Sequence, residues 1–92
     1  MKRKVGILIS GRGSNMTALI EAARDPDFPA EIALVLSNRA DAGGLERAAG
    51  AGLAAAVIDH RAFPDRASFD AAMDARLRAA GVEIVCLAGF MR

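Results

Sequence analysis

The sequence lacks tryptophan and tyrosine, and its 92 residues include one histidine and one cysteine. A single cysteine excludes an internal disulfide, and these two residues alone do not make a set of soft ligands at metal spacing, so we expect no metal. The formal net charge is only +1, and few aromatic rings remain for stacking bases. Nucleic-acid binding is therefore not expected.

Long apolar runs are also absent. No run reaches the roughly 18 residues that a membrane span needs, and the Met-Lys-Arg-Lys start leads too soon into glycines for a signal-peptide core. We expect a cytoplasmic protein without a membrane partner. What the chain does have is 53% hydrophobic and 25% charged residues, a composition typical of one soluble globular domain.

Four short apolar segments predict the strands of a sheet: residues 5–9, 31–36, 55–58 and 84–87. Three helices are predicted between them: one carrying Met16, Leu19, Ile20 and Ala23, an alanine-rich one around Leu45, Ala48 and Ala49, and one carrying Phe69, Met73, Leu77 and Ala80. Asp65 is the expected N-cap of the last helix, and Gly81 closes it. Strands that alternate with helices at this spacing build βαβ units.

The predicted fold is therefore α/β, with a Rossmann-like parallel sheet and helices on both faces. Right-handed crossovers move the first three strands outward, and the fourth returns beside the first, which gives the order 3-2-1-4. The ligand crevice is expected between strands one and four, where residues 10–15 and 89–92 meet. The last strand is apolar and no helix follows it, so we expect a chain truncated after the fourth strand.

The stretch ILISGRGSN, residues 7–15, carries the first strand straight into a glycine turn. Gly11 and Gly13 allow an anion to approach the start of the following helix, whose unpaired N–H groups attract negative charge. Ser14 and Asn15 can cap the helix or donate hydrogen bonds to phosphate oxygens. The alternative is a tight turn that needs glycine only for its backbone conformation.

The neighbouring residues narrow the choice of phosphate. A dinucleotide fingerprint needs a small residue where Met16 stands, and a P-loop needs Lys-Ser or Lys-Thr where this loop has Ser14-Asn15. A single small phosphate, as on a phosphoribosyl compound, fits the short loop better. Arg39 after the second strand could still meet a 2′-phosphate, so an NADP-binding oxidoreductase domain remains a less favoured alternative.

Four motifs in order, ILISGRGSN, LSNRADAGGLERA, FPDRASFD and VCLAGFMR, resemble the N-terminal half of the phosphoribosylglycinamide formyltransferases. The resemblance covers essentially all of residues 1–92. It implies that these residues are the N-terminal, phosphoribosyl-substrate-binding part of a formyltransferase domain whose remainder is absent. The implied reaction transfers a formyl group from 10-formyltetrahydrofolate to the amine of 5′-phosphoribosylglycinamide in de novo purine (IMP) biosynthesis.

The resemblance also implies roles for individual residues. Gly13, Ser14 and Asn15 match the segment that holds the substrate phosphate. Arg66, Met91 and Arg92 match residues along the folate cosubstrate, with the arginines facing its glutamate carboxylates.

No catalytic residue is expected in this chain, because the family's asparagine, histidine and aspartate lie beyond the point that matches Arg92. We expect His60 to be a surface loop histidine and Cys86 to be a small buried hydrophobic residue. The alternative function is an inactive fragment that binds a phosphoribosyl ligand or acts as an assembly module, with self-association through the exposed edge of the fourth strand.

Overall fold

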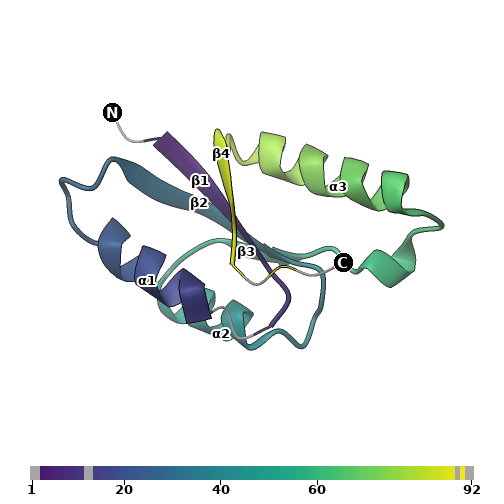
Figure 1. The fold of residues 1–92 in the computed structure, drawn as a ribbon, viewed down its shortest axis with the longest axis horizontal. Helices are drawn as coiled ribbons and strands as arrows, with labels where there is room; N and C mark the ends of the chain where they lie inside the picture. The colour runs from purple at the N-terminus through teal and green to yellow at the C-terminus, as the bar shows by residue number, and fades with distance from the viewer. Residues whose placement is uncertain (1–2, 12–13, 89, 91–92) are drawn as a thin grey trace.

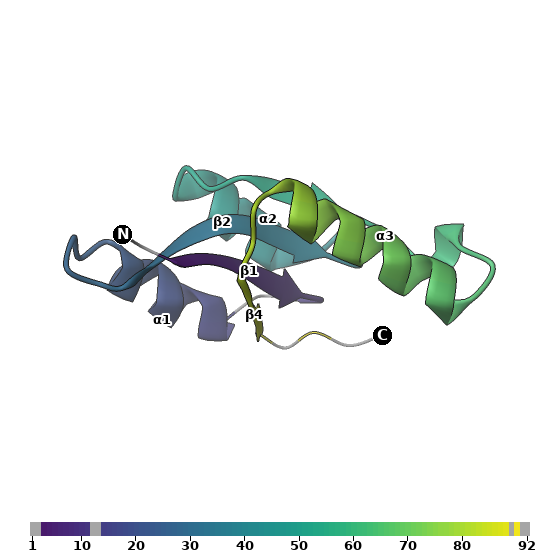
Figure 2. The same cartoon turned by 90° about the horizontal axis from the view of Figure 1, so that it is seen from above.

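The computed structural model describes residues 3–11, 14–88 and 90. Its elements are β1 (Arg3–Ile9), α1 (Ser14–Ala23), β2 (Ala30–Ser37), α2 (Gly43–Gly50), β3 (Ala55–Val57), a 3₁₀ turn η1 (His60–Ala62), α3 (Arg66–Ala79) and β4 (Ile84–Leu87). The strands form one sheet in the order β3-β2-β1-β4, and each neighbouring pair is parallel (Figures 1 and 2). The predicted order is confirmed.

β1 runs through the centre of the sheet, where both of its faces are covered. Ile7 and Ile9 are fully buried on one face, and Leu8 is buried on the other, so from Val5 onward the strand is continuously apolar rather than alternating. Its neighbours are β2 and β4, with Ile7 opposite Val35 and Cys86. The continuous apolar run that predicted this strand follows from its central position.

The helices divide between the two faces, with α1 and α2 on one side of the sheet and α3 on the other (Figure 1). The face covered by α1 and α2 contains the buried residues Val5, Ile7, Ile9, Met16, Ile20, Val35, Ala42, Ala48 and Ala88. The face covered by α3 contains Leu8, Leu34, Leu36, Phe69, Met73 and Leu77. Most of the apolar residues that recur at helical spacing in the sequence pack in these two layers.

The ends of α3 follow the predicted chemistry. The Asp65 carboxylate accepts a hydrogen bond from the backbone N–H of Ser68 at 2.7 Å, so Asp65 is the N-cap. Gly81 follows the helix with φ of 76°, a left-handed conformation that glycine adopts without a steric penalty. Sequence reasoning missed η1, which begins where the Asp59 carboxylate accepts from the backbone N–H of Arg61.

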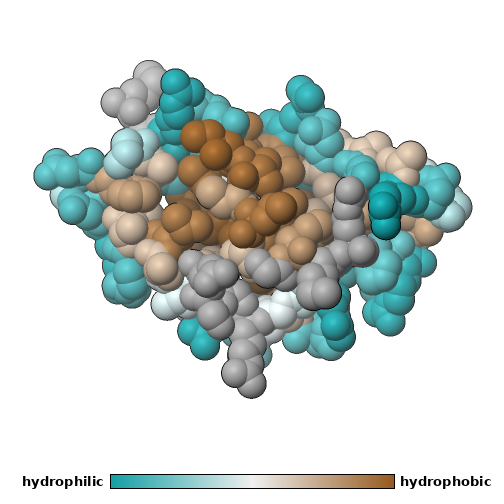
Figure 3. Space-filling model, in the orientation of Figure 1, coloured by the Kyte–Doolittle hydropathy of each residue, from teal (hydrophilic) through white to brown (hydrophobic). Residues whose placement is uncertain are grey.

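β4 lies at an edge of the sheet and is paired with β1 on one side only among the described residues. Ile84, Val85 and Leu87 are exposed by 44%, 46% and 67%. Hydrophobic surface accordingly gathers over the middle of the molecule, where β4 lies (Figure 3). Cys86 is half-buried rather than buried, because no further strand or helix covers this edge in the part of the chain that the structure describes.

No helix among the described residues is both long enough and apolar enough to cross a membrane.

Candidate functional site

The carboxyl ends of the strands meet at one edge of the sheet, as in other parallel sheets. β1 leads there into Ser10 and Gly11, β2 into Asn38, and β4 into Ala88. The backbone N–H of Ala88 donates to the carbonyl of Leu8 at 2.9 Å and keeps the β4 end beside β1. This edge contains the glycine loop singled out in the sequence.

The first two residues of the glycine loop are held by hydrogen bonds from the chain that follows β2. The Ser10 hydroxyl donates to Asn38 Oδ1 at 2.8 Å, and Asn38 is only 1% exposed. The Gly11 carbonyl accepts from the backbone N–H of Gly44, in the first turn of α2, at 2.9 Å. We call these four residues, Ser10, Gly11, Asn38 and Gly44, the clasp.

The clasp also completes the start of α2. Its N-cap position is Ala42, which has no side-chain acceptor for the free N–H groups of the first turn. The Gly11 carbonyl supplies one such acceptor to Gly44. The glycine loop and α2 therefore stabilise each other across the carboxyl edge.

The turn between β2 and α2 is fixed locally. The Ser37 hydroxyl donates to the carbonyl of Arg39 at 2.8 Å and accepts from the N–H of Arg39 at 3.0 Å. The Arg39 guanidinium makes two 3.1 Å hydrogen bonds to the Asp41 carboxylate. Arg39 is thus already paired with an acid, which weakens its suitability for the 2′-phosphate of NADP.

The predicted phosphate-binding residues that the structure describes begin the helix α1. Ser14 and Asn15 are the first two residues of α1, so their backbone stands at a helix N-terminus. Gly13 lies outside the described residues. A helix that begins three residues after Gly11 has the unpaired N-terminal N–H groups that an anion site needs, so the phosphate site stays a prediction.

Arg66 is the first residue of α3 and is exposed. It lines a recess of about 190 Å³ together with His60, Asp65 and Phe69. No hydrogen bond or ion pair connects Arg66 to another residue in the part of the chain that is described. The recess contains no residue of the clasp, and Met91 and Arg92 lie outside the described residues.

A second recess of about 340 Å³ opens beside the first and is lined by Arg39, Ala40, Asp41, His60 and Arg61. The Arg61 side chain holds the pKa of Asp59 at about 2, mainly through hydrogen bonds from its guanidinium and then from its backbone N–H. The same contact raises the pKa of Arg61. Each arginine that lines this recess is paired with an aspartate, so its charge is already neutralised. The recess is therefore a poor site for an anion.

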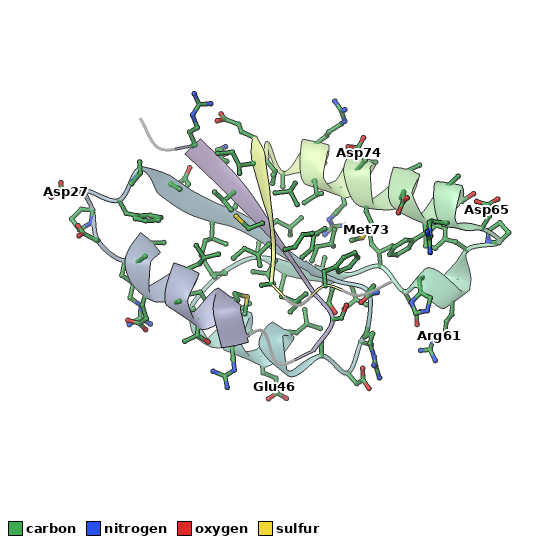
Figure 4. All side chains as sticks on the ribbon, viewed as in Figure 1. Asp27, Glu46, Arg61, Asp65, Met73 and Asp74 are labelled. Carbon is green, nitrogen blue, oxygen red and sulfur yellow. The ribbon has the colours of Figure 1, made fainter. Side chains whose placement is uncertain are left out.

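His60 lies on the surface, as expected, and its ring packs edge to face on Phe69 with 6.2 Å between ring centroids. Its Nδ1 is 3.9 Å from the Asp59 carboxylate, and the side chains around this turn appear near Arg61 and Asp65 in Figure 4. The contact with Phe69 gives the histidine a packing role at the start of α3.

The third recess is an apolar groove of about 300 Å³ between α3 and the β1–β4 pair. It is lined by Leu8, Phe69, Asp70, Met73, Asp74, Leu77, Leu87 and Phe90. Met73 belongs to the groove's apolar lining, and the carboxylates of Asp70 and Asp74 are its acidic groups (Figure 4). Sequence reasoning did not find this groove, because its apolar lining residues, taken one by one, are typical of a buried core.

Sequence reasoning also missed Asn38 and Ser10 as partners. The available signal was a polar Ser-Asn pair directly after an apolar strand, at the edge where a parallel sheet binds ligands. No group of three or more histidine, cysteine, aspartate or glutamate residues that could hold a metal ion is found among the described residues.

Comparisons with known proteins agree on one family. The model of the formyl transferase family matches residues 3–92. The chain is 47% identical over 91 residues to the human trifunctional purine biosynthetic protein adenosine-3, covering 99% of the chain and 9% of that protein. It is 40% identical over 90 residues to phosphoribosylglycinamide formyltransferase of Haemophilus influenzae, covering 98% of the chain and 42% of that enzyme.

Solved structures give the same result. Glycinamide ribonucleotide transformylase 1 from Symbiobacterium toebii superposes with a TM-score of 0.95 at 49% identity, over 99% of the chain and 43% of that protein. Phosphoribosylglycinamide formyltransferase from Brucella melitensis superposes with a TM-score of 0.97 at 47% identity, over 100% of the chain and 48% of that protein. The chain thus spans less than half the length of each of these relatives.

Proposed function

Because the chain belongs to the formyl transferase family, we propose that it supplies the phosphate-binding part of a phosphoribosylglycinamide formyltransferase. Such an enzyme transfers the formyl group of 10-formyltetrahydrofolate to the amine of 5′-phosphoribosylglycinamide in purine biosynthesis. The observation that carries the proposal is the clasp, which holds Ser10 and Gly11 at the carboxyl edge of the sheet, three residues of sequence before α1 begins at Ser14.

The substrate phosphate is proposed to bind at Gly13, Ser14 and Asn15. A phosphate at the start of α1 meets backbone N–H groups that have no partner within the helix, together with the positive end of the helix dipole. A glycine before the helix leaves no Cβ between the backbone and the phosphate oxygens. The carbonyl of Gly11 already bonds to Gly44 and so does not compete for these donors.

The folate cosubstrate is proposed to lie along Arg66, Met91 and Arg92. Arg66 supports this role because its guanidinium is exposed beside a recess that Phe69 also lines. A guanidinium can donate two parallel hydrogen bonds to a carboxylate such as those of the folate's glutamate. A negative charge there would also offset the unfavourable position of a cation at the N-terminus of α3.

The proposed chemistry is acyl transfer. The substrate amine attacks the formyl carbon, a new C–N bond forms and the amine loses a proton; the bond between that carbon and the folate nitrogen then breaks as that nitrogen gains a proton. The tetrahedral intermediate needs a proton carrier and a donor to its oxyanion. We assign neither role within residues 1–92, because His60 packs on Phe69 away from the clasp and Asp59 is paired with Arg61.

Binding measurements test the proposal. The complete polypeptide that the reading frame encodes should bind phosphoribosylglycinamide in calorimetry, and Gly13→Val should abolish most of the heat because a side chain would occupy the phosphate position. Gly50→Ala is the matched control, since a Cβ at Gly50 meets nothing within 4 Å. Equal heats for wild type and Gly13→Val would rule out the glycine loop as the phosphate site. Residues 1–92 alone are expected to show no formyl transfer, and measurable turnover would contradict that part.

A second candidate function is assembly through β4, favoured by the exposed side chains of Ile84, Val85 and Leu87. An unpaired apolar edge strand offers backbone N–H and C=O groups to another chain. Sedimentation of residues 1–92 should then show concentration-dependent association that Leu87→Lys weakens. A monomer at every concentration would exclude this candidate while leaving the binding experiment unaffected.

A further inference from the structure

Asn38 is an unusual residue for its surroundings. With Ser37 it is one of two polar residues that are buried in the described part of the chain, and its exposed fraction is 1%. A buried amide is unfavourable unless its polar atoms are hydrogen-bonded, and an apolar residue would avoid that demand. The place of Asn38 therefore calls for an explanation beyond packing.

Its partner lies on the glycine loop. Asn38 Oδ1 accepts from the Ser10 hydroxyl at 2.8 Å, across 28 positions of sequence. The second link of the clasp, from Gly44 N–H to the Gly11 carbonyl at 2.9 Å, lies next to it. Two consecutive loop residues are thus tied to two points of the β2–α2 connection.

We propose that Asn38, acting through Ser10, is a positioning residue that fixes the start of the glycine loop, at Ser10 and Gly11, before the phosphate binds. The inference rests on the proposed function, because the ligand it names is the phosphate monoester of the ribosyl substrate. A binding site whose first residues are already fixed loses less conformational entropy when the ligand binds, so its affinity is higher.

The neutrality of the clasp supports this role. The nearby turns at Asp41 and Asp59 are held by carboxylates paired with arginines. Ser10, Gly11, Asn38 and Gly44 carry no charge, so the clasp fixes the loop without placing a negative group beside a phosphate. An aspartate at position 38 would offer the same acceptor to Ser10 but would add the unfavourable charge.

The variants follow from this chemistry. Ser10→Ala removes the donor, Asn38→Asp keeps the shape and adds a negative charge, and Ser10→Thr retains the hydroxyl. Met73→Ala is the matched control for general loss of stability, since Met73 is buried on the α3 face away from the clasp. Each is made in the complete polypeptide encoded by the reading frame.

Steady-state kinetics give the first readout. Ser10→Ala should raise the KM for phosphoribosylglycinamide by roughly tenfold, the scale of one lost hydrogen bond, and Asn38→Asp should raise it through the negative charge that it adds near the phosphate, while kcat and the KM for the folate stay close to wild type. Ser10→Thr should recover most of the loss. Met73→Ala should lower the unfolding midpoint without changing either KM.

Backbone amide NMR gives the second readout and separates the two proposals. Inorganic phosphate should shift the amide signals of residues 11–15 in the wild type and shift them less in Ser10→Ala. If the wild type binds phosphate and the variants bind it equally well, the role of Asn38 is overturned and the proposed function still stands. Wild-type protein that binds neither phosphate nor phosphoribosylglycinamide would overturn both. A KM that rises equally for both substrates, or rises in Met73→Ala as well, would also reject positioning.

Discussion

The two faces of the sheet are covered unequally. Two helices, α1 and α2, lie on one face, where Ile7, Ile9 and Met16 have no exposed surface. One helix, α3, lies on the other face, and a groove of about 300 Å³ remains between it and the β1–β4 pair. The α1–α2 side also has a recess, of about 270 Å³, but it is lined by α1, β2 and the segment after α2 and contains no residue of β1. Beside β1, packing is therefore closer on the α1–α2 side than on the α3 side.

This difference matches the two parts of the proposed site. Ser10 and Gly11, the start of the glycine loop, are hydrogen-bonded to Asn38 and to Gly44 of α2, a helix of the closely packed face, where we propose the phosphate site. Arg66 begins α3 on the loosely packed face and lies beside open recesses. The proposal thus assigns the small, rigid phosphate to the closely packed face and the long, flexible cosubstrate to the loosely packed face.

The largest expected effect comes from removing a side chain on the closely packed face. Ile7→Ala should lower the free energy of unfolding by about 4 kcal/mol, because close packing prevents collapse around the new cavity. Leu77→Ala, on the α3 face beside the groove, should lower it by only about 3 kcal/mol. Urea denaturation of both variants in the complete polypeptide measures the difference. Equal losses, or a larger loss for Leu77→Ala, would contradict the unequal packing.

Gly6 tests a close approach between β1 and the α3 face. A Cβ at this position would lie 2.8 Å from Leu77 Cδ2 and 3.1 Å from both Val82 Cγ atoms. Leu77 can rotate, but β-branched Val82 has little freedom, so Gly6→Ala should lower the free energy of unfolding by about 1–3 kcal/mol.

Gly50→Ala is the control for this change, because its Cβ meets nothing within 4 Å and Gly50 ends a helix. Alanine there should be neutral or stabilise by about 0.5 kcal/mol. If Gly6→Ala proves as harmless as Gly50→Ala, β1 and α3 do not approach as closely as the structure indicates.

Much of the fold could be predicted from the sequence, because its signals are local. Apolar runs marked all four strands, and the β4 bounds were predicted without error. Asp65 and Gly81 identified the ends of α3 through cap chemistry that involves only neighbouring residues. The strand order followed from the handedness of the crossovers.

The parts that could not be predicted depend on distant contacts. The bond from Ser10 to Asn38 joins two loops, and neither residue type predicts its burial. The exposure of Val85 depends on what covers β4, whereas its sequence reads as a buried strand. The roles of Gly13, Ser14, Asn15, Arg66, Met91 and Arg92 came from the family resemblance and stay predictions until ligand binding is measured.

The N-cap of α3 gives a smaller effect on the loosely packed face. Hydrogen bonds from Ser68, first from its backbone N–H, lower the pKa of Asp65 below 3.8. Because the folded-state pKa is depressed, this stabilisation is present above pH 3.8 and is lost as the pH falls. Asp65→Ala should reduce the thermal midpoint at pH 7, and Asp65→Ser should retain most of it. Asp74→Ala, which breaks only an exposed pair with Arg78, should change it less.

Asp59 gives the smallest effect and the most specific pH dependence. Its carboxylate accepts from Arg61 Nη2 at 2.9 Å and from the Arg61 backbone N–H at 2.9 Å, which holds its pKa at about 2 instead of 3.8. The resulting stabilisation is present above pH 3.8 and disappears as the pH falls to about 2, because protonation then removes the charge.

Asp59→Asn should therefore lower the urea midpoint slightly at pH 7 and match the wild type near pH 2, whereas Ile7→Ala should keep its full deficit at both values. Carboxyl-carbon NMR follows the titration directly. A titration midpoint near 3.8 would mean that Arg61 does not bind the Asp59 carboxylate in solution. The turn before α3 would then lack these hydrogen bonds, on the face of the sheet that is less closely packed.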